Sequence, residues 1–143
     1  MHNSKIKKKI ITLIGPTACN KTSTAVHLIK KFPISIIGVD SVQIYKRFNI
    51  GSAKPPKEIL EKYKHHLVDS ADPENIFSVK DFYDQAYRIV LQAHSNNRIP
   101  LLVGGTMMYF NAVFKGINDI PEGNEAIREE LQQELDNKGV DKL

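Results

Sequence analysis

The segment GPTACNKT at residues 15–22 constrains the fold more than any other part of the sequence. It follows a short apolar run with β-branched residues at positions 10–14, which predicts a buried parallel strand. It precedes a stretch with apolar residues at helical spacing, which predicts a helix that Pro33 ends. The apolar positions of this helix are Ala25, Leu28, Ile29 and Phe32. A strand, a tight loop and a helix in this order are typical of a parallel α/β sheet.

The same segment matches the phosphate-loop pattern GxxxxGK[ST] except that Asn20 replaces the second glycine. Such loops bind phosphate because backbone N–H groups point inward at a helix N-terminus, a lysine adds charge and a hydroxyl reaches Mg²⁺. Asparagine tolerates the left-handed backbone that glycine otherwise supplies, so we expect Asn20 to have a positive φ. We therefore predict a phosphate site at Gly15, Pro16, Thr17, Ala18, Cys19, Asn20, Lys21 and Thr22, with Thr22 as the Mg²⁺ ligand. The alternative is a plain strand-to-helix turn with a capping lysine.

Strands and helices continue to alternate along the chain. Apolar runs at residues 34–39 and 99–103 predict two further buried strands, and residues 66–68 are a weaker candidate. Ser78 and Asp81 resemble a capping box before a helical apolar stripe. Gly116 is placed to end a helix that starts near Thr106, and a last helix is expected at residues 124–137. The predicted fold class is α/β, a parallel sheet with helices on both faces.

Asp40 comes directly after the predicted strand at residues 34–39. Ligands of open parallel sheets lie beyond the carboxyl ends of the strands, so Asp40 should lie close to residues 15–22. A carboxylate there can orient Mg²⁺ or take a proton from an incoming nucleophile. The alternative is a local turn with Ser41.

Composition excludes some classes. The single cysteine, Cys19, excludes an internal disulfide and a cysteine metal cluster, which fits a reducing cytoplasm. No apolar run approaches the roughly 18 residues of a membrane span, so a cytoplasmic protein without membrane association is expected. The net charge of +4 is compatible with a polyanionic partner.

Several strings carry a resemblance to a known family. They are GPTACNKT, VDSVQIYKRFNIGSAKP, HHLVD, FSVKDFYDQA and IPLLVGGTMMYFNAVFKG. In this order and spacing they are similar to the N-terminal half of the tRNA dimethylallyltransferase family. The resemblance implies a P-loop kinase-like fold, incomplete at its C-terminal end. It also implies an enzyme that moves a dimethylallyl group from dimethylallyl diphosphate, with Mg²⁺, to the exocyclic amine of the adenine next to the tRNA anticodon.

The resemblance also implies roles for individual residues. Residues 15–22 hold the diphosphate, with Lys21 and Thr22 acting in catalysis. Asp40 is the general base and meets the target nucleotide together with Ser41, Val42 and Gln43. Thr106 and Arg128 contact the tRNA. The family usually has serine and glycine where this chain has Cys19 and Asn20.

The resemblance covers only the first half of the family pattern. We therefore expect residues 1–143 to be the N-terminal portion of the catalytic domain, with residues 117–143 starting a tRNA-contacting insertion. One sheet edge or face should expose apolar surface, and these residues alone should have little transferase activity. The full-length protein is expected to be a monomer.

Two other functions remain open. A small-molecule P-loop kinase would use the same phosphate chemistry, although DSVQIY and GGTMMYF have no evident purpose in such an enzyme. An inactive, truncated RNA- or nucleotide-binding remnant would share the fold and differ only in turnover.

Overall fold

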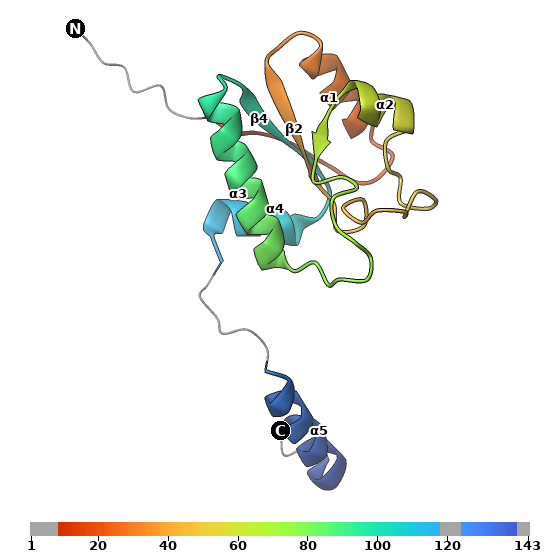
Figure 1. Cartoon of the computed structure of the whole chain (residues 1–143), viewed down its shortest axis with the longest axis vertical. Helices are drawn as coiled ribbons and strands as arrows, with labels where there is room; N and C mark the ends of the chain where they lie inside the picture. Colours follow the sequence, from red (N-terminus) through yellow and green to blue (C-terminus); the bar gives the residue numbers. More distant parts are fainter. Residues whose placement is uncertain (1–8, 118–123, 140–143) are drawn as a thin grey trace, which may run out of the picture.

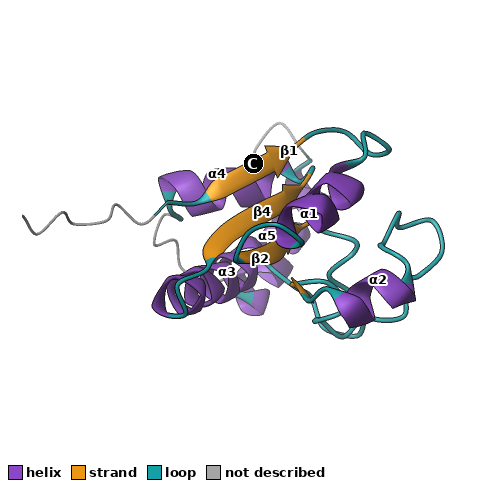
Figure 2. Ribbon diagram, turned by 90° about the horizontal axis from the view of Figure 1, so that it is seen from above, coloured by secondary structure: helices purple, strands orange, loops and turns teal. Residues whose placement is uncertain are grey.

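A computed structural model of the chain describes residues 9–117 and 124–139. In these residues a four-stranded parallel sheet has the strand order β1-β4-β2-β3 (Figures 1 and 2). The strands are β1 (Ile11–Ile14), β2 (Ile34–Val39), β3 (His65–His66) and β4 (Ile99–Gly104). The helices are α1 (Lys21–Ile29), α2 (Lys57–Lys62), α3 (Val79–Ser95), α4 (Met107–Lys115) and α5 (Glu125–Lys138). The predicted α/β class and the parallel sheet are confirmed.

The two central strands are apolar on both faces because helices cover both faces (Figure 1). Ile36 and Leu101 pack with residues of α1, whereas their chain neighbours Ile37 and Leu102 pack with α3 and α4. This alternation follows from the two-residue period of a strand. The continuous apolar runs in the sequence therefore correspond to strands with two buried faces.

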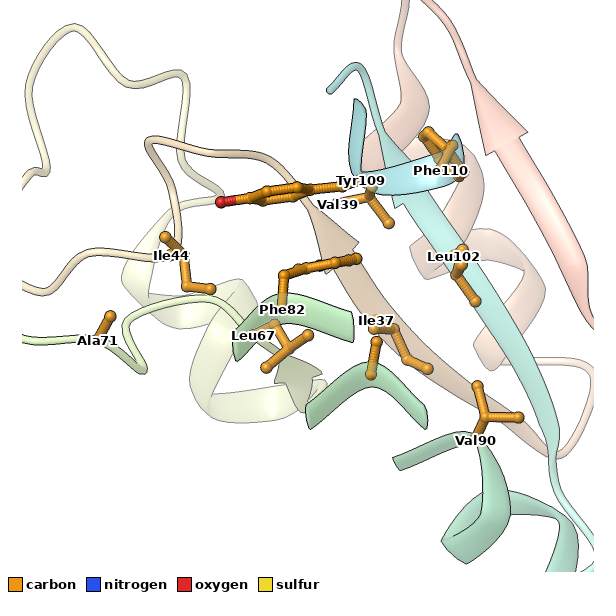
Figure 3. Close-up of a cluster of buried hydrophobic side chains, with 11 residues drawn as sticks. Ile37, Val39, Ile44, Leu67, Ala71, Phe82, Val90, Leu102, Tyr109 and Phe110 are labelled. Carbon is orange, nitrogen blue, oxygen red and sulfur yellow. The ribbon is translucent and has the colours of Figure 1, made fainter. Parts of the chain in front are cut away.

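The larger core lies between the sheet and the pair α3 and α4 (Figure 3). The rings of Phe82 and Tyr109 stack at its centre, with centroids 4.1 Å apart and planes 9° from parallel. Burial raises the pKa of the Tyr109 hydroxyl. Helix α3 begins with the expected capping box, in which the Ser78 hydroxyl accepts from the Asp81 N–H and the Asp81 carboxylate accepts from the Ser78 N–H.

Three local expectations were wrong. Strand β1 is parallel but not buried: it pairs only with β4 in the described residues, and Ile11 and Ile14 are 43% and 44% exposed. Helix α1 ends at Ile29, so Phe32 lies outside it and is 52% exposed; a residue before proline disfavours helical backbone angles. The short helix α2 was not expected, because its sequence shows no apolar stripe.

The carboxyl ends of β1, β2 and β4 are tied closely together. The Gly105 and Thr106 N–H groups both donate to the Val39 carbonyl at 3.2 Å. A Cβ atom on Gly104 would lie 1.9 Å from that carbonyl oxygen, so only glycine permits this approach. The segments that follow these strands are thereby brought to one edge of the sheet.

Among the described residues, no helix is long and apolar enough to cross a membrane.

Candidate functional site

A cavity of about 230 Å³ lies at the carboxyl edge of the sheet, where the phosphate loop and the Asp40 loop meet. Residues from three strand ends and one distant loop line it. They are Thr17, Ala18, Cys19, Asn20, Lys21, Thr22, Ser23, Asp40, Gln43, Ala53, Val103 and Gly104. The structure therefore brings together most of the predicted phosphate loop with Asp40 and Gln43.

The backbone of the phosphate loop is left-handed at two residues. Asn20 has φ 60° and ψ 24°, as the sequence predicts, and Ala18 has φ 65°. A Cβ atom on Gly15 would lie 2.8 Å from the Cys19 sulfur, so a side chain there would displace the Cys19 side chain. In the described part of the chain, no hydrogen bond is formed by the N–H groups from Thr17 to Thr22. These donors at the start of α1 are available to an anion.

Lys21 places its ammonium group at the mouth of this loop. Its Nζ donates to the carbonyls of Gly15 and Pro16, at 2.7 Å and 2.5 Å, and lies 3.6 Å from the Cys19 sulfur. The plain alternative, in which the lysine caps loop carbonyls, thus describes these contacts. It does not account for the free N–H groups or for the cavity.

Asp40 uses one carboxylate oxygen to fix its own loop. Its Oδ1 accepts from the N–H groups of Val42 and Gln43, at 2.9 Å and 3.1 Å. This local turn resembles the alternative that the sequence left open, although the partners lie beyond Ser41. Among the described residues no hydrogen bond is made to Oδ2. One oxygen therefore orients the carboxylate, while the other is available in the cavity that Asp40 lines.

The other residues predicted to contact the tRNA lie at two different places in the structure. The Ser41 N–H donates to the Thr106 hydroxyl at 3.1 Å, so these two predicted tRNA-binding residues lie side by side. Arg128 lies on α5, which has no buried residue, and its side chain pairs with Glu125 at 3.6 Å. Arg128 does not line the cavity.

Tyr45, Tyr109 and Phe110 follow the predicted contact segments in the sequence, and an aromatic ring there can either stack on a base or belong to the core. Tyr109 and Phe110 are 3% and 1% exposed and belong to the main core (Figure 3). The Tyr45 hydroxyl accepts from the Phe77 N–H at 3.1 Å. All three have structural roles here.

The far wall of the cavity depends on a residue that sequence reasoning missed. The Lys54 side chain is only 4% exposed, and its ammonium donates to three acceptors from separate segments. These are Tyr45 O at 2.9 Å, Asn49 Oδ1 at 3.2 Å and Asp69 Oδ1 at 2.6 Å. The Gln43 amide adds bonds to the Ser52 and Ala53 carbonyls. Residues 51–56, which look like a linker in the sequence, therefore form a fixed loop.

We expect Lys54→Met to lower the free energy of unfolding by about 2 kcal/mol, because it removes the donor for one charged and two neutral acceptors. The exposed Lys57 offers a matched control, since its pair with Glu61 is solvated and Lys57→Met should cost less than about 0.5 kcal/mol. Urea unfolding followed by circular dichroism measures both. Equal losses for the two variants would contradict this role of Lys54.

Asn20→Gly should change stability by less than about 1 kcal/mol and leave diphosphate binding intact, because glycine adopts the same left-handed backbone. Asn20→Val should cost about 1–2 kcal/mol, since a β-branched residue is strained at this φ. Thermal unfolding and diphosphate titration of both variants check the pair. A valine variant as stable as wild type would mean that the loop does not need this conformation.

Comparison with known proteins gives one family. A family model described as IPP transferase matches residues 43–143. A tRNA dimethylallyltransferase of Dichelobacter nodosus is 42% identical over 134 residues, covering 94% of this chain and 42% of the relative. One from Legionella pneumophila (strain Corby) is 44% identical over 138 residues, covering 96% and 44%.

Two solved structures are also similar. The full-length tRNA isopentenylpyrophosphate transferase from Bacillus halodurans is 40% identical with a TM-score of 0.75, covering 94% of this chain and 45% of that one. A eukaryotic dimethylallyltransferase acting on tRNA is 26% identical with a TM-score of 0.76, covering 87% and 32%.

A parallel sheet whose first strand leads through a glycine-lysine loop into the first helix defines the phosphate-loop class of α/β proteins. Within this class, the family model and the relatives described above all indicate one family. The chain belongs to the IPP transferase family. It spans less than half the length of these curated relatives, 42% and 44%.

Proposed function

We propose that this chain is the N-terminal, diphosphate-binding part of an enzyme that transfers a dimethylallyl group from dimethylallyl diphosphate to the exocyclic amine of the adenine beside a tRNA anticodon. The observation that carries the proposal is the shared cavity of the phosphate loop and Asp40. It places donors for a diphosphate next to a carboxylate that can accept a proton. The family membership and the names of the relatives support the choice of substrates.

In the proposed reaction, a bond forms between the amine nitrogen of adenine and the allylic carbon, and the bond from that carbon to the diphosphate oxygen breaks. An exocyclic amine is a weak nucleophile, so it needs to lose a proton as the new bond forms. Asp40 takes this proton on its carboxylate. The N–H groups of Val42 and Gln43 hold the carboxylate through Oδ1 during the transfer.

The diphosphate leaves with the electron pair of the broken bond and gains negative charge. The free N–H groups at the start of α1 and the Lys21 ammonium are placed to bind that charge more strongly as it grows. The left-handed residues Ala18 and Asn20 set the loop in advance, so little rearrangement is needed.

The residues present also suit a divalent cation. Thr22 supplies a hydroxyl to the cavity, and Mg²⁺ binds such oxygens while keeping several waters. Bound there, Mg²⁺ would neutralise part of the charge on the diphosphate. Among residues 9–117 and 124–139, no group of three or more His, Cys, Asp and Glu side chains could hold a metal ion, so the substrate would supply further ligands.

The tRNA contacts are proposed at two places. Ser41, Val42 and Gln43 lie beside Asp40, and the Ser41–Thr106 contact joins them to the start of α4. Arg128 on α5 would reach the tRNA as part of an insertion that starts within residues 117–143. Residues 118–123, whose sequence looks like a short linker, and residues 140–143 lie outside the described residues.

Exposed apolar side chains agree with a chain that needs further covering. Ile11 and Ile14 on β1 and Met107, Met108 and Phe114 on α4 are each more than 40% exposed. The expected uncovered edge is therefore present, at β1. We propose that the rest of the full-length protein covers this surface and completes the pocket that excludes water.

A ligand-preference experiment separates this function from a small-molecule kinase. We would titrate residues 1–143, with Mg²⁺, with dimethylallyl diphosphate and with ATP in a calorimeter. The transferase proposal expects dimethylallyl diphosphate to bind and ATP to bind no more tightly than inorganic diphosphate does. Tight binding of ATP without binding of dimethylallyl diphosphate would support the kinase.

A further inference from the structure

A second cavity, of about 370 Å³, lies at the opposite end of the sheet from the phosphate loop. Ile34 and Ser35 start β2 and Arg98 precedes β4, so this cavity opens at the amino ends of the strands. The end of α1, the segment after α2 and the last turns of α3 complete its wall. None of its residues lines the cavity at the carboxyl ends.

The lining is basic and contains no carboxylate. Lys62, Lys64 and Arg98 carry positive charge, and His66 lies among them. In the described part of the chain, no ion pair involves these three cations. Burial, together with the positive charges of Lys64 and Arg98 and the neighbouring His65, lowers the pKa of His66. The group of cations is thus held together without a counterion from the protein.

Arg98 is the fixed member of this group. Its Nε donates to the Ser35 hydroxyl at 3.0 Å, and its Nη2 donates to the Ile34 carbonyl. Both acceptors are neutral, so the guanidinium keeps its full charge beside the cavity. Ser35 lies on β2 and is only 8% exposed. Its buried hydroxyl therefore holds the guanidinium at a fixed place on the sheet.

The cavity also has an apolar and aromatic part. Ile29, Ile34, Ile89 and Ala93 contribute apolar side chains. The Tyr63 ring has the ammonium groups of Lys30 and Lys62 at 5.9 Å and 5.7 Å from its centroid. Cavities of this volume that bind small molecules commonly have mostly apolar walls and a few fixed polar groups.

The C-terminal end of α3 does not offset this positive charge with free carbonyls. The Asn96 N–H and the Arg98 N–H already donate to carbonyls of its last turn, and the Ser95 hydroxyl donates to the Gln92 carbonyl. The negative end of the helix is therefore largely satisfied locally.

We propose that this cavity binds a phosphate-bearing nucleotide, with the phosphate between Arg98 and Lys64 and the base or sugar against the apolar wall and Tyr63. A guanidinium and ammonium groups are the usual partners of phosphate, and Arg98 is already oriented. The nucleotide can come from a free mononucleotide or from an RNA strand. The proposal is independent of the transferase function, because the two cavities share no residue.

Adenosine monophosphate is the first probe, used without a metal. We would record amide and arginine side-chain NMR spectra of residues 1–143 during its titration. Saturable shifts are expected at Ser35, Ala93 and Arg98, and they should persist in Lys21→Ala, which disables the phosphate loop. Shifts confined to residues 15–22 would overturn the proposal.

A double variant, Lys62→Gln with Lys64→Gln, tests the contribution of charge without removing the anchored arginine. It should weaken binding of the mononucleotide at the cavity by about tenfold or more, which corresponds to about 1.4 kcal/mol. The matched control, Lys46→Gln with Lys115→Gln, removes two exposed lysines outside the cavity and should change affinity less than about twofold. If both double variants weaken binding equally, the effect comes from the net charge of the protein alone, and the proposed site is wrong.

A stem-loop RNA distinguishes the two sources of the nucleotide. If the RNA gives the same shifts at Ser35 and Arg98, and the Lys62 and Lys64 variant weakens them, the cavity takes a nucleotide of an RNA strand. If only the mononucleotide gives them, the ligand is free. If neither the mononucleotide nor the RNA shifts the signals of Ser35 and Arg98, the cavity binds no nucleotide and the proposal is wrong.

Discussion

Asp40→Asn is expected to lower the rate of transfer about 100-fold or more, while both substrates bind nearly as in wild type. Asparagine keeps an oxygen that can accept from the N–H groups of Val42 and Gln43, so the loop should hold its shape. It cannot accept the proton that the adenine amine must lose. The mutation therefore removes the base and leaves the cavity.

The measurement needs residues 1–143 joined to the remaining half of a relative such as the Dichelobacter nodosus enzyme. Single-turnover rates on an anticodon stem-loop are compared with affinities for each substrate. Asp84→Asn, at an exposed carboxylate on α3, is the matched control and should leave the rate unchanged. An Asp40→Asn protein that loses diphosphate affinity would instead identify Asp40 as a metal-orienting residue and favour a kinase.

Lys21→Ala is expected to weaken the binding of diphosphate by at least about 100-fold, since it removes the cation at the mouth of the loop. Because the side chain contributes no contact to either core cluster, the fold should survive. Calorimetry with inorganic diphosphate and Mg²⁺ measures the affinity, and circular dichroism checks the fold.

Lys115→Ala provides the control for this prediction, because Lys115 is an exposed lysine on α4 that does not line the cavity. It should bind diphosphate as wild type does. If Lys21→Ala also binds diphosphate normally, residues 15–22 are not the phosphate site, and the proposed function loses its main support.

The sheet and the loop at its edge could be predicted because local chemistry determines them. The predicted bounds of strand β2 match the structure at both ends, because a strand that is buried on both faces appears in the sequence as one continuous apolar run. Asn20 was expected in a left-handed conformation because a second glycine was missing from the pattern. Asp40 was assigned to the same edge because all carboxyl ends of a parallel sheet meet there.

The features that were missed depend on contacts between distant segments. Exposure of β1 follows from its place at the sheet edge, which no local pattern reports. Lys54 reads as one more surface lysine, yet Asp69 and Tyr45 surround its ammonium. The string GSAKP was part of the family resemblance, but no property of the single residues indicated that Lys54 fixes the loop whose Ala53 lines the cavity.

The predicted tRNA contact of Arg128 has no counterpart in the residue's surroundings on α5 in the described part of the chain. Its role was inferred from the family resemblance alone, and the structure pairs it only with Glu125 on its own helix among the described residues. The tRNA contact of Arg128 stays a prediction.

The most direct test is to identify the product of transfer from labelled dimethylallyl diphosphate to an anticodon stem-loop RNA, using residues 1–143 joined to the second half of a relative. We predict that the label is found on the exocyclic amine of the adenine next to the anticodon, and that free diphosphate is released in equal amount. Label that never reaches the RNA, together with phosphate transfer from ATP to a small alcohol, would contradict the account.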